Sequence, residues 1–441
     1  MQKNIVKFLI FFLLGLGVVS QSIAQNLPTA KPEEVGLSSA RLANIDKYFQ
    51  SLIDKKQVAG AVTLVSRRGK IAHFKAYGMA DIENKKPMQK DSMFRICSQT
   101  KLISAVAGMM LWEQGYFSLN DPVSKYIPEM KDLKVIEYDP KDRNKYTIVP
   151  AKKPMLIYQA FNFTSGFTYS GFLAGPALTK MLGDAGLNNG FWFNDYDLKE
   201  YFKRRAQIPL LNHPGEQWNY GTDLQTVARL VEIFSGMSFG DFCRERIFKP
   251  LGMGDTYFYV PKEKVPRVAT LYLKTPEALE KTEPGKTYFR PELGIEEPLN
   301  PFWFTGGPEK YFGAGEGLIT TTEDYAKFAQ MMLNGGILNG VRILGRKTVE
   351  FLSTDHVGDI PCCKYLLGVE GWGLGVALVK DPGKNHMIGT PGAYWWGGWM
   401  NTTWKIDSKE NMFFILMTQQ LPGNNPYRNT FNDLVYQSII D

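Results

Sequence analysis

The spacing of apolar residues between positions 59 and 81 predicts a β-hairpin. The stretch AGAVTLVSRRGKIAHFKAYGMAD has two strand-like runs, separated by Arg67, Arg68, Gly69 and Lys70. Runs rich in β-branched and aromatic residues on either side of a short turn pair as antiparallel strands. A sheet therefore begins early in the chain.

Two later stretches have helical spacing instead. In TDLQTVARLVEIFSG (222–236) and TTTEDYAKFAQMMLNGG (320–336), the apolar residues share one face and glycines follow. This period predicts two amphipathic helices that end near Gly236 and Gly335. The expected core-facing residues are Val227, Leu230, Val231, Phe234, Tyr325, Phe328, Met331 and Met332.

The last hundred residues return to strand patterns. Strands are predicted in WGLGVALVKDPG (372–383), WWGGWMNTTWKID (395–407) and NMFFILMTQ (411–419), and a closing helix in NTFNDLVYQSII (429–440). Strands near both ends of the chain predict one sheet, built from about 25–95 and 300–441, with a helical middle at about 96–300. The predicted fold class is α/β (α+β).

Composition adds few constraints. The chain has 441 residues, of which 44% are hydrophobic and 22% charged, as in an ordinary folded protein. The formal net charge of +7 is small, and basic residues are interspersed with acidic ones. This pattern does not favour a nucleic-acid partner.

The first 24 residues predict a secretory signal peptide. Lys3 and Lys7 precede an apolar run from Phe8 to Val19, and small residues follow at Ser22 and Ala24. Cleavage would lower the charge from +7 to +5, because two lysines and no acidic residue leave. An uncleaved anchor is the alternative, although the run is short for a membrane span. We expect an exported protein, periplasmic or secreted, with no stable membrane span after signal removal.

The four cysteines show no metal-ligand spacing. We expect Cys97 and Cys243 to be small buried residues. The disulfide state of the adjacent Cys362 and Cys363 stays open. No metal or other cofactor is predicted.

Ser98 and Lys101 are the first candidates for chemistry. They lie three residues apart in MFRICSQTKLISAVAGMMLWEQG (93–115), so on a helix the amine and the hydroxyl share a face. A helix N-terminus also favours developing negative charge. Because one or two Ser-x-x-Lys matches are expected by chance in such a chain, this pair needs further support.

Five motifs in order supply that support. They are the Ser98 stretch continued as SLNDPVSKYIPEM, then FTSGFTYSG (163–171), HPGEQWNYGTD (213–223), RIFKPLGMGDTYF (246–258) and WWGGW (395–399). From about residue 32 onward, the chain resembles the serine β-lactamase and penicillin-binding protein superfamily, above all class C β-lactamases and family VIII carboxylesterases. The resemblance implies an antiparallel sheet flanked by helices, an all-helical subdomain and a site in the cleft between them.

The same resemblance implies roles for individual residues. It makes Ser98 the acylated nucleophile and gives it Lys101 and Tyr220 as an acid/base pair. Either a neutral Lys101 or an ionised Tyr220 could accept the serine proton, and the sequence leaves this open.

The family's edge-strand motif aligns with Trp396, Gly397 and Gly398. The glycines would let a substrate approach the strand closely. The oxyanion hole would combine the backbone N–H groups of Ser98 and Trp399.

Two departures from the family pattern favour a less charged ester as the substrate. Thr222 stands where many relatives have Asn, and Trp396 stands where β-lactamases usually have the Lys that grips a carboxylate. Other aromatic residues could line an apolar acyl pocket or belong to the core; these are Trp303, Phe304, Trp395 and Trp399.

A rival serine lies in GMSFG (236–240), which matches the Gly-x-Ser-x-Gly elbow of α/β-hydrolases. Ser238 would need a preceding strand, whereas the residues before it have helical spacing. His356 and His386 follow in a permissible order for a triad, but no HGGG segment supplies an oxyanion hole. The other two histidines, His73 and His213, are expected to be structural.

The sequence therefore predicts an exported serine hydrolase, a carboxylesterase that forms a covalent acyl-enzyme on Ser98. One alternative is a β-lactamase or D-amino-acid peptidase that acts on cell-wall-like amides. Another is a non-catalytic binding module. The expected partner is a small-molecule ester or amide, and neither the natural substrate nor the oligomeric state follows from the sequence.

Overall fold

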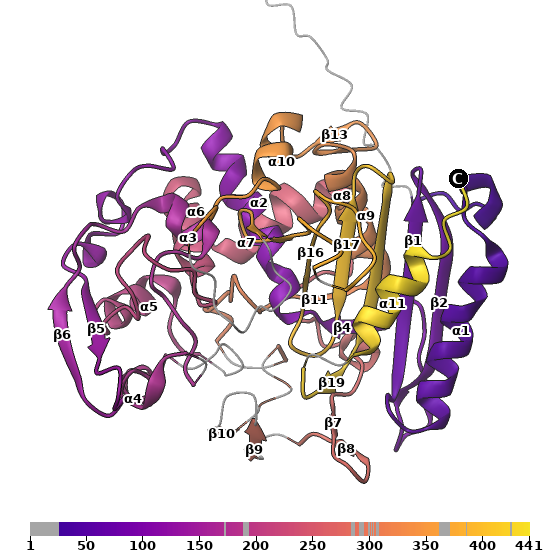
Figure 1. Ribbon diagram of the computed structural model, residues 1–441, viewed down its shortest axis with the longest axis horizontal. Helices are drawn as coiled ribbons and strands as arrows, with labels where there is room; N and C mark the ends of the chain where they lie inside the picture. Colours follow the sequence, from indigo (N-terminus) through magenta and orange to yellow (C-terminus); the bar gives the residue numbers. More distant parts are fainter. Residues whose placement is uncertain are drawn as a thin grey trace, which may run out of the picture.

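An eight-stranded antiparallel sheet, drawn from both ends of the chain, organises the computed structural model (Figure 1). The structure describes residues 26–441 except 172, 188–193, 284–286, 291–294, 299, 301, 303, 306–307, 361–370, 385 and 424–425. The strand order is β14-β15-β16-β17-β18-β1-β2-β3, so the predicted two-ended sheet is present. Its strands are β1 (Gly60–Arg67), β2 (Lys70–Asp81), β3 (Lys86–Pro87), β14 (Gly371–Trp372), β15 (Ala377–Leu378), β16 (Tyr394–Gly397), β17 (Thr403–Asp407) and β18 (Met412–Thr418).

The predicted N-terminal hairpin is confirmed, and its turn explains the residues found there. Arg68 and Gly69 have φ values of 52° and 74°. Two successive residues with positive φ form the turn that matches the natural twist of a hairpin. Strand β1 then pairs on its other side with β18, from Ala61 opposite Thr418 to Arg67 opposite Met412.

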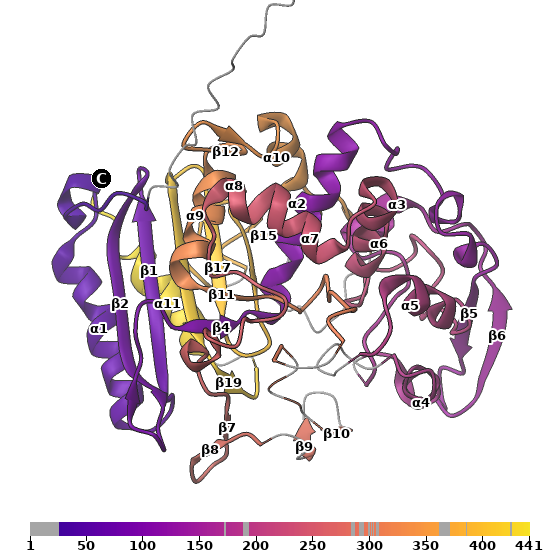
Figure 2. The same cartoon turned by 180° about the vertical axis from the view of Figure 1, so that it is seen from behind.

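The sheet is buried on both faces. Alternate side chains of β1 point to opposite faces of the sheet. Ala61 and Val65 pack in the core on the first face, and Val62 and Leu64 pack in the core on the second face. Helices α1 (Ser39–Asp54) and α11 (Tyr427–Tyr436) cover the first face, and α9 (Thr322–Leu333) packs on the second (Figures 1 and 2).

The middle of the chain contains most of the remaining helices. Its helices are α2 (Thr100–Glu113), α3 (Ile157–Asn162), α4 (Gly175–Asp184), α5 (Leu198–Arg205), α6 (Leu224–Ser235), α7 (Phe239–Cys243) and α8 (Lys249–Leu251). Helix α10 (Arg346–Leu352) follows α9. Helix α6 ends at Gly236 in the left-handed conformation, which confirms the predicted stop.

The structure adds strands that the sequence analysis did not predict in this middle region. The hairpin of β5 (Lys134–Tyr138) and β6 (Tyr146–Pro150) stands at the far end of the helical part (Figure 1). Four of the five β6 residues are exposed, so this strand is held mainly by its pairing with β5. Smaller ladders are formed by β4 (Met93–Arg95), β7 (Tyr272–Lys274), β8 (Leu279–Lys281), β9 (Thr287–Arg290), β10 (Ile295–Pro298), β11 (Ile319–Thr321), β12 (Ile337–Leu338), β13 (Val341–Arg342) and β19 (Gln420–Leu421).

Several sequence predictions concern residues outside the described part of the chain: the signal peptide at 1–24, the Cys362 and Cys363 pair, and Trp303. Cys97 and Cys243 are described, free and buried, as predicted. Within the described ranges, every helix is too short or too polar to cross a membrane.

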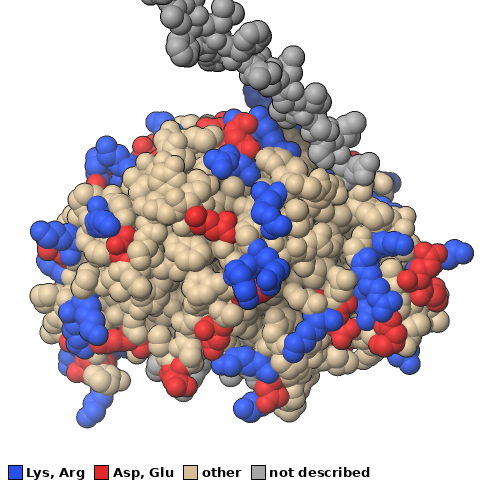
Figure 3. Space-filling view, turned by 90° about the horizontal axis from the view of Figure 1, so that it is seen from above, with Lys and Arg blue, Asp and Glu red and all other residues tan. Residues whose placement is uncertain are grey.

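Charges on the face seen in Figure 3 follow the sequence pattern. Lysine and arginine side chains are interspersed with acidic ones and do not form one continuous basic surface there.

Candidate active site

Ser98 lies where a short strand turns into a helix. Strand β4 pairs with β11, and the N–H of Ile96 continues this pairing by donating to the Leu318 carbonyl at 3.0 Å. Cys97 then adopts a φ of 45°, which is uncommon for a residue other than glycine and turns the chain sharply. Ser98 follows in a single 3-10 turn (Cys97–Gln99) at the start of α2 and is 9% exposed.

The Lys101 amine lies beside Ser98, in the first turn of α2. Its Nζ is 3.1 Å from Ser98 Oγ, 2.9 Å from the Tyr169 hydroxyl and 2.8 Å from the Gly315 carbonyl oxygen. A neutral amine has two N–H donors and one lone pair. Donation to Gly315 and Tyr169 would leave the lone pair free to accept the Ser98 proton.

Burial changes the acidity of this amine. Lys101 is fully buried, and loss of hydration lowers the pKa of its ammonium to about 8. The carboxyl groups of Glu316 and Asp223 oppose that shift because they favour the charged form. About one tenth of Lys101 is therefore neutral at pH 7, and this share grows as the pH rises.

Tyr220 approaches Ser98 from the helical part of the molecule. Tyr220 lies in the loop before α6, and its hydroxyl is 2.6 Å from Ser98 Oγ. The ring stacks on Phe163 at a centroid distance of 5.8 Å and contacts Trp396 at 5.3 Å. Burial raises the pKa of the phenol well above its ordinary value. Lys101 is thus the group of this pair that becomes a free base near neutral pH.

The structure gives Trp396 a contact that the sequence did not predict. The indole N–H donates to the Tyr220 hydroxyl at 3.0 Å, and the side chain is buried. A substrate-facing side chain was expected at this position. The Trp396 indole instead orients the Tyr220 phenol. Thr222 is also engaged, since its Oγ1 accepts from the Tyr201 hydroxyl at 2.9 Å.

Close packing also explains why the two residues after Trp396 are glycines. A Cβ atom on Gly398 would lie 2.4 Å from the Ile96 carbonyl oxygen, and one on Gly397 would lie 2.8 Å from an Arg428 nitrogen. Gly398 therefore lets the chain after β16 approach the segment that carries Ser98. This places Trp399 next to that segment, as an oxyanion hole built from both would require.

Three polar residues around Lys101 were missed by the sequence analysis. Tyr169 lies within the FTSGFTYSG motif, but spacing alone assigned it no role. Glu316 lies between glycines ahead of β11, and Gln225 lies in the first turn of α6. The one signal in the sequence is Glu316, an acidic residue between two glycines. The sequence does not show that Glu316 lies near Lys101.

Comparison with known proteins decides the family. The family description "Beta-lactamase" matches residues 45–437. The chain belongs to the Beta-lactamase family.

Relatives within this family include named esterases. The chain is 28% identical to Protein Rv1367c of Mycobacterium tuberculosis (strain ATCC 25618 / H37Rv), over 85% of this chain and 89% of that protein. It is 27% identical to Esterase EstB of Burkholderia gladioli, over 88% of this chain and 93% of that protein. The protein is thus a serine hydrolase of the Beta-lactamase family.

A solved structure shows the same fold. EstCE1, titled "a hydrolase with promiscuous acyltransferase activity", superposes with a TM-score of 0.77 at 23% identity and covers 90% of this chain and 99% of that one. The predicted fold of antiparallel sheet and helices is therefore confirmed.

The rival serine of this Beta-lactamase family member is a helix cap. Ser238 Oγ accepts from the Asp241 backbone N–H at 3.0 Å and donates to the Asp241 carboxylate at 2.7 Å, at the start of α7. His356 bonds instead to the Phe351 carbonyl at 2.8 Å. Neither Ser238 nor His356 therefore has the contact that an α/β-hydrolase triad would require between them.

His73 and His213 each contact a polar side chain. His73 is buried 2.7 Å from the Thr63 hydroxyl, and His213 lies 3.4 Å from Glu137. Among the described residues, no group of three or more His, Cys, Asp or Glu side chains is arranged to hold a metal ion.

Proposed function

We propose that this protein is an exported carboxylesterase that forms a covalent acyl-enzyme on Ser98. The observation that carries the proposal is the convergence of one hydroxyl, one amine and one phenol. Ser98 Oγ lies 3.1 Å from Lys101 Nζ and 2.6 Å from the Tyr220 hydroxyl. A serine beside a desolvated base is the arrangement that nucleophilic catalysis requires.

In the proposed acylation, neutral Lys101 accepts the Ser98 proton as Ser98 Oγ attacks the ester carbonyl carbon. The oxyanion that forms would be bound by the backbone N–H groups of Ser98 and Trp399. Collapse of this intermediate breaks the bond to the alcohol oxygen. Tyr220 donates its proton to that oxygen and regains one from the Lys101 ammonium, so the alcohol leaves neutral.

Deacylation repeats these steps with water. Water loses a proton to the Lys101 and Tyr220 pair as its oxygen attacks the acyl carbon, and the second intermediate releases the acid. The departing Ser98 oxygen takes the proton back. The enzyme returns to its starting protonation state without a cofactor in the scheme.

An uncharged ester suits this site better than a carboxylate-bearing β-lactam. The edge-strand position that would supply a cation holds Trp396, and its N–H is bound to Tyr220. The aromatic rings of Phe163, Trp218 and Trp396 pack around the phenol and favour an apolar group.

The test compares substrates and a single variant. We expect the purified protein to hydrolyse short-chain p-nitrophenyl esters faster than a chromogenic cephalosporin, and Ser98→Ala to abolish both activities. Faster cephalosporin turnover would favour the β-lactamase alternative. Folded protein that turns over neither substrate would favour the binding module.

Export is part of the proposal and rests on the sequence of residues 1–24. Expression of the whole chain in a Gram-negative host, followed by intact-mass analysis of the periplasmic fraction, checks it. A mature chain that starts at Gln25 is the expected product. A chain retaining residues 1–24 in the membrane fraction would support the uncleaved anchor.

A further inference from the structure

Two buried carboxylates face Lys101 and take no part in the reaction scheme above. Glu316 is 3% exposed and Asp223 is 0% exposed. Buried carboxylates are rare unless they are paired or hydrogen-bonded. Their presence beside a buried amine calls for a functional reason.

Glu316 is linked to the Lys101 amine through the preceding residue, Gly315, whose carbonyl binds that amine. The Gly315 carbonyl accepts from Lys101 Nζ at 2.8 Å, and Glu316 is the next residue in the chain. On its other side, Gln225 Nε2 donates to Glu316 Oε1 at 3.1 Å and lies 2.8 Å from the Tyr311 hydroxyl. Gln225 therefore holds the Glu316 carboxylate beside the residue whose carbonyl binds the amine.

We propose that Glu316 is a positioning residue for Lys101: it fixes the loop whose carbonyl holds the amine, and its negative charge keeps that amine a strong base. The inference rests on the proposed roles of Ser98 and Lys101. A fully buried amine without a counter-charge would lose so much basicity that it could no longer pull the proton from a serine.

Four other titratable groups also face the Lys101 amine. They are Asp223, Cys97, Tyr169 and Tyr220. Burial raises the pKa of the Cys97 thiol to about 12, and raises the pKa values of both phenols, so these three groups stay neutral near pH 7.

Asp223 has partners of its own. Its Oδ1 accepts from the Ser165 hydroxyl at 2.5 Å, and the Arg205 guanidinium is a nearby positive charge. Burial raises the pKa of this carboxyl to about 8, so it carries only part of a charge at neutral pH. Burial also raises the pKa of Glu316, and the Lys101 charge opposes that rise. Because Gln225 donates to it and Gly315 joins it to the amine, Glu316 is the main counter-charge.

The experiment measures how fast a fluorophosphonate labels Ser98 between pH 5.5 and 9.5. In the wild type, labelling should rise with pH as Lys101 loses its proton. In Glu316→Gln, loss of the negative charge makes the ammonium more acidic, so the rise should move to lower pH. Labelling at pH 6, relative to the plateau, should increase about tenfold. The plateau itself should fall several-fold, because a weaker base activates Ser98 less well.

Controls separate charge from packing. Glu316→Asp keeps the charge and should leave the rise near its wild-type pH. Asp324→Asn removes a different buried carboxylate, paired with Lys327, and should not move the rise even if it destabilises the protein. A lower plateau with an unmoved rise in Glu316→Gln would overturn the proposal, because a purely structural role predicts that result.

The design remains informative if a variant folds poorly or if the proposed function fails. The midpoint of the rise does not depend on the folded fraction, and Gln225→Met, which removes one donor to Glu316, should move it in the same direction by less. An unmoved midpoint there contradicts the proposal. Wild-type protein that is labelled but hydrolyses no ester would refute the proposed function and leave this inference standing; no labelling at all would refute both.

Discussion

The Lys101 amine is fully buried and closely surrounded by oxygen atoms. Three oxygen atoms surround it within 3.1 Å, and two of them belong to segments far from it in the sequence. The amine has no contact with solvent, and in the proposed mechanism its lone pair is directed toward Ser98. The residue that makes this arrangement possible is Gly315, which has no side chain.

Substitution of Gly315 tests that packing. An added Cβ would lie 3.0 Å from the Tyr169 hydroxyl and 3.1 Å from Lys101 Nζ, so Gly315→Ala should displace the amine. We expect kcat/KM for an ester to fall between about tenfold and 100-fold, with little change in the melting temperature. Gly183→Ala is the matched control, because a Cβ there meets no atom within 4 Å. Equal activity of the two variants would contradict the account.

The Trp396 indole tests the orientation of the phenol. Trp396→Phe keeps an aromatic ring but loses the N–H that donates to Tyr220 at 3.0 Å. Loss of one hydrogen bond should lower kcat/KM by about two- to tenfold. In Trp404→Phe the lost indole N–H is buried without a hydrogen-bond partner in the described part of the chain, so activity should hold. Steady-state kinetics on both variants decide the matter.

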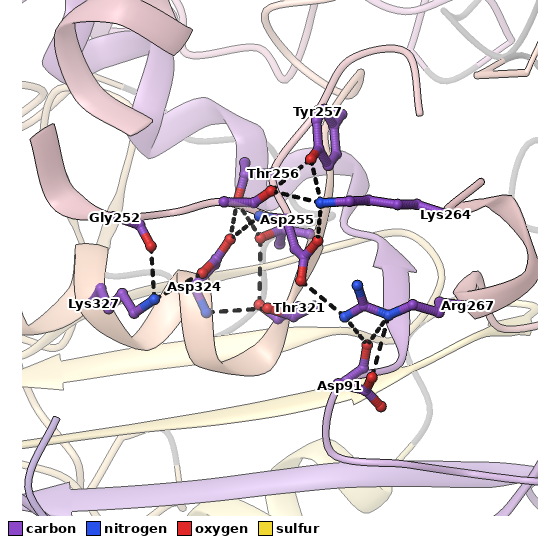
Figure 4. A network of polar contacts seen from close by, with 12 residues as sticks. Asp91, Gly252, Asp255, Thr256, Tyr257, Lys264, Arg267, Thr321, Asp324 and Lys327 are labelled. Carbon is purple, nitrogen blue, oxygen red and sulfur yellow. Dashed lines mark hydrogen bonds and ion pairs between the residues drawn. The ribbon is translucent and has the colours of Figure 1, made fainter. Parts of the chain in front are cut away.

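At the scale of elements, helix α9 is attached to the loop before β7 by a buried network (Figure 4). The Asp324 carboxylate accepts from the backbone N–H of Asp255 at 2.6 Å and pairs with Lys327 at 3.1 Å. Lys327 also donates to the Gly252 carbonyl at 2.7 Å. Both charged side chains are nearly inaccessible, so the network orients the helix that supports the sheet.

Breaking this pair should destabilise the fold without touching the chemistry. Asp324→Asn leaves the buried Lys327 ammonium without its counter-charge, which costs about 3–5 kcal/mol of unfolding free energy. Urea denaturation followed by tryptophan fluorescence measures the change. Glu323→Gln, on the same helical turn but less buried, should have a much smaller effect. Similar losses in both variants would mean that the helix terminus, and not the buried pair, provides the stability.

Sequence periodicity predicted the elements far better than the contacts between them. The hairpin, α6, α9 and the C-terminal strands follow from local spacing. The Ser98 and Lys101 pair also follows, because an i, i+3 separation on one helix is a local feature. Tyr220 needed the ordered motifs of a resemblance, since spacing alone does not connect two distant loops.

The contacts that tune the site lie beyond this kind of prediction. Gly315 lies 214 positions from Lys101 in the sequence, and Glu316 and Gln225 meet only in the folded chain. The exposed strand β6 was missed for a related reason, since its stability comes from pairing with β5 and not from its own apolar pattern.

At the scale of the whole molecule, the two ends of the chain close one sheet. Arg67, at the end of β1, joins them: its guanidinium donates to the Gly36 carbonyl at 2.8 Å and pairs with Glu410 at 3.0 Å and Asp441 at 2.5 Å. The side chain is buried, and the adjacent Arg68, which also pairs with Asp441, is largely exposed.

This difference in burial predicts different costs for two neighbouring substitutions. Arg67→Met should lower the unfolding free energy by about 2 kcal/mol or more, because backbone carbonyls and carboxylates lose a buried donor. Arg68→Met should change little, as exposed ion pairs contribute weakly. Thermal unfolding of both variants provides the comparison, and equal shifts would show that Arg67 does not hold the termini together.

The central claim is that Ser98 is an activated nucleophile, and intact-mass analysis after fluorophosphonate treatment tests it most directly. We expect a single covalent adduct, mapped by peptide sequencing to Ser98, which disappears in Ser98→Ala and forms far more slowly in Lys101→Ala. An adduct that persists in Ser98→Ala, or full-rate labelling without Lys101, would contradict it.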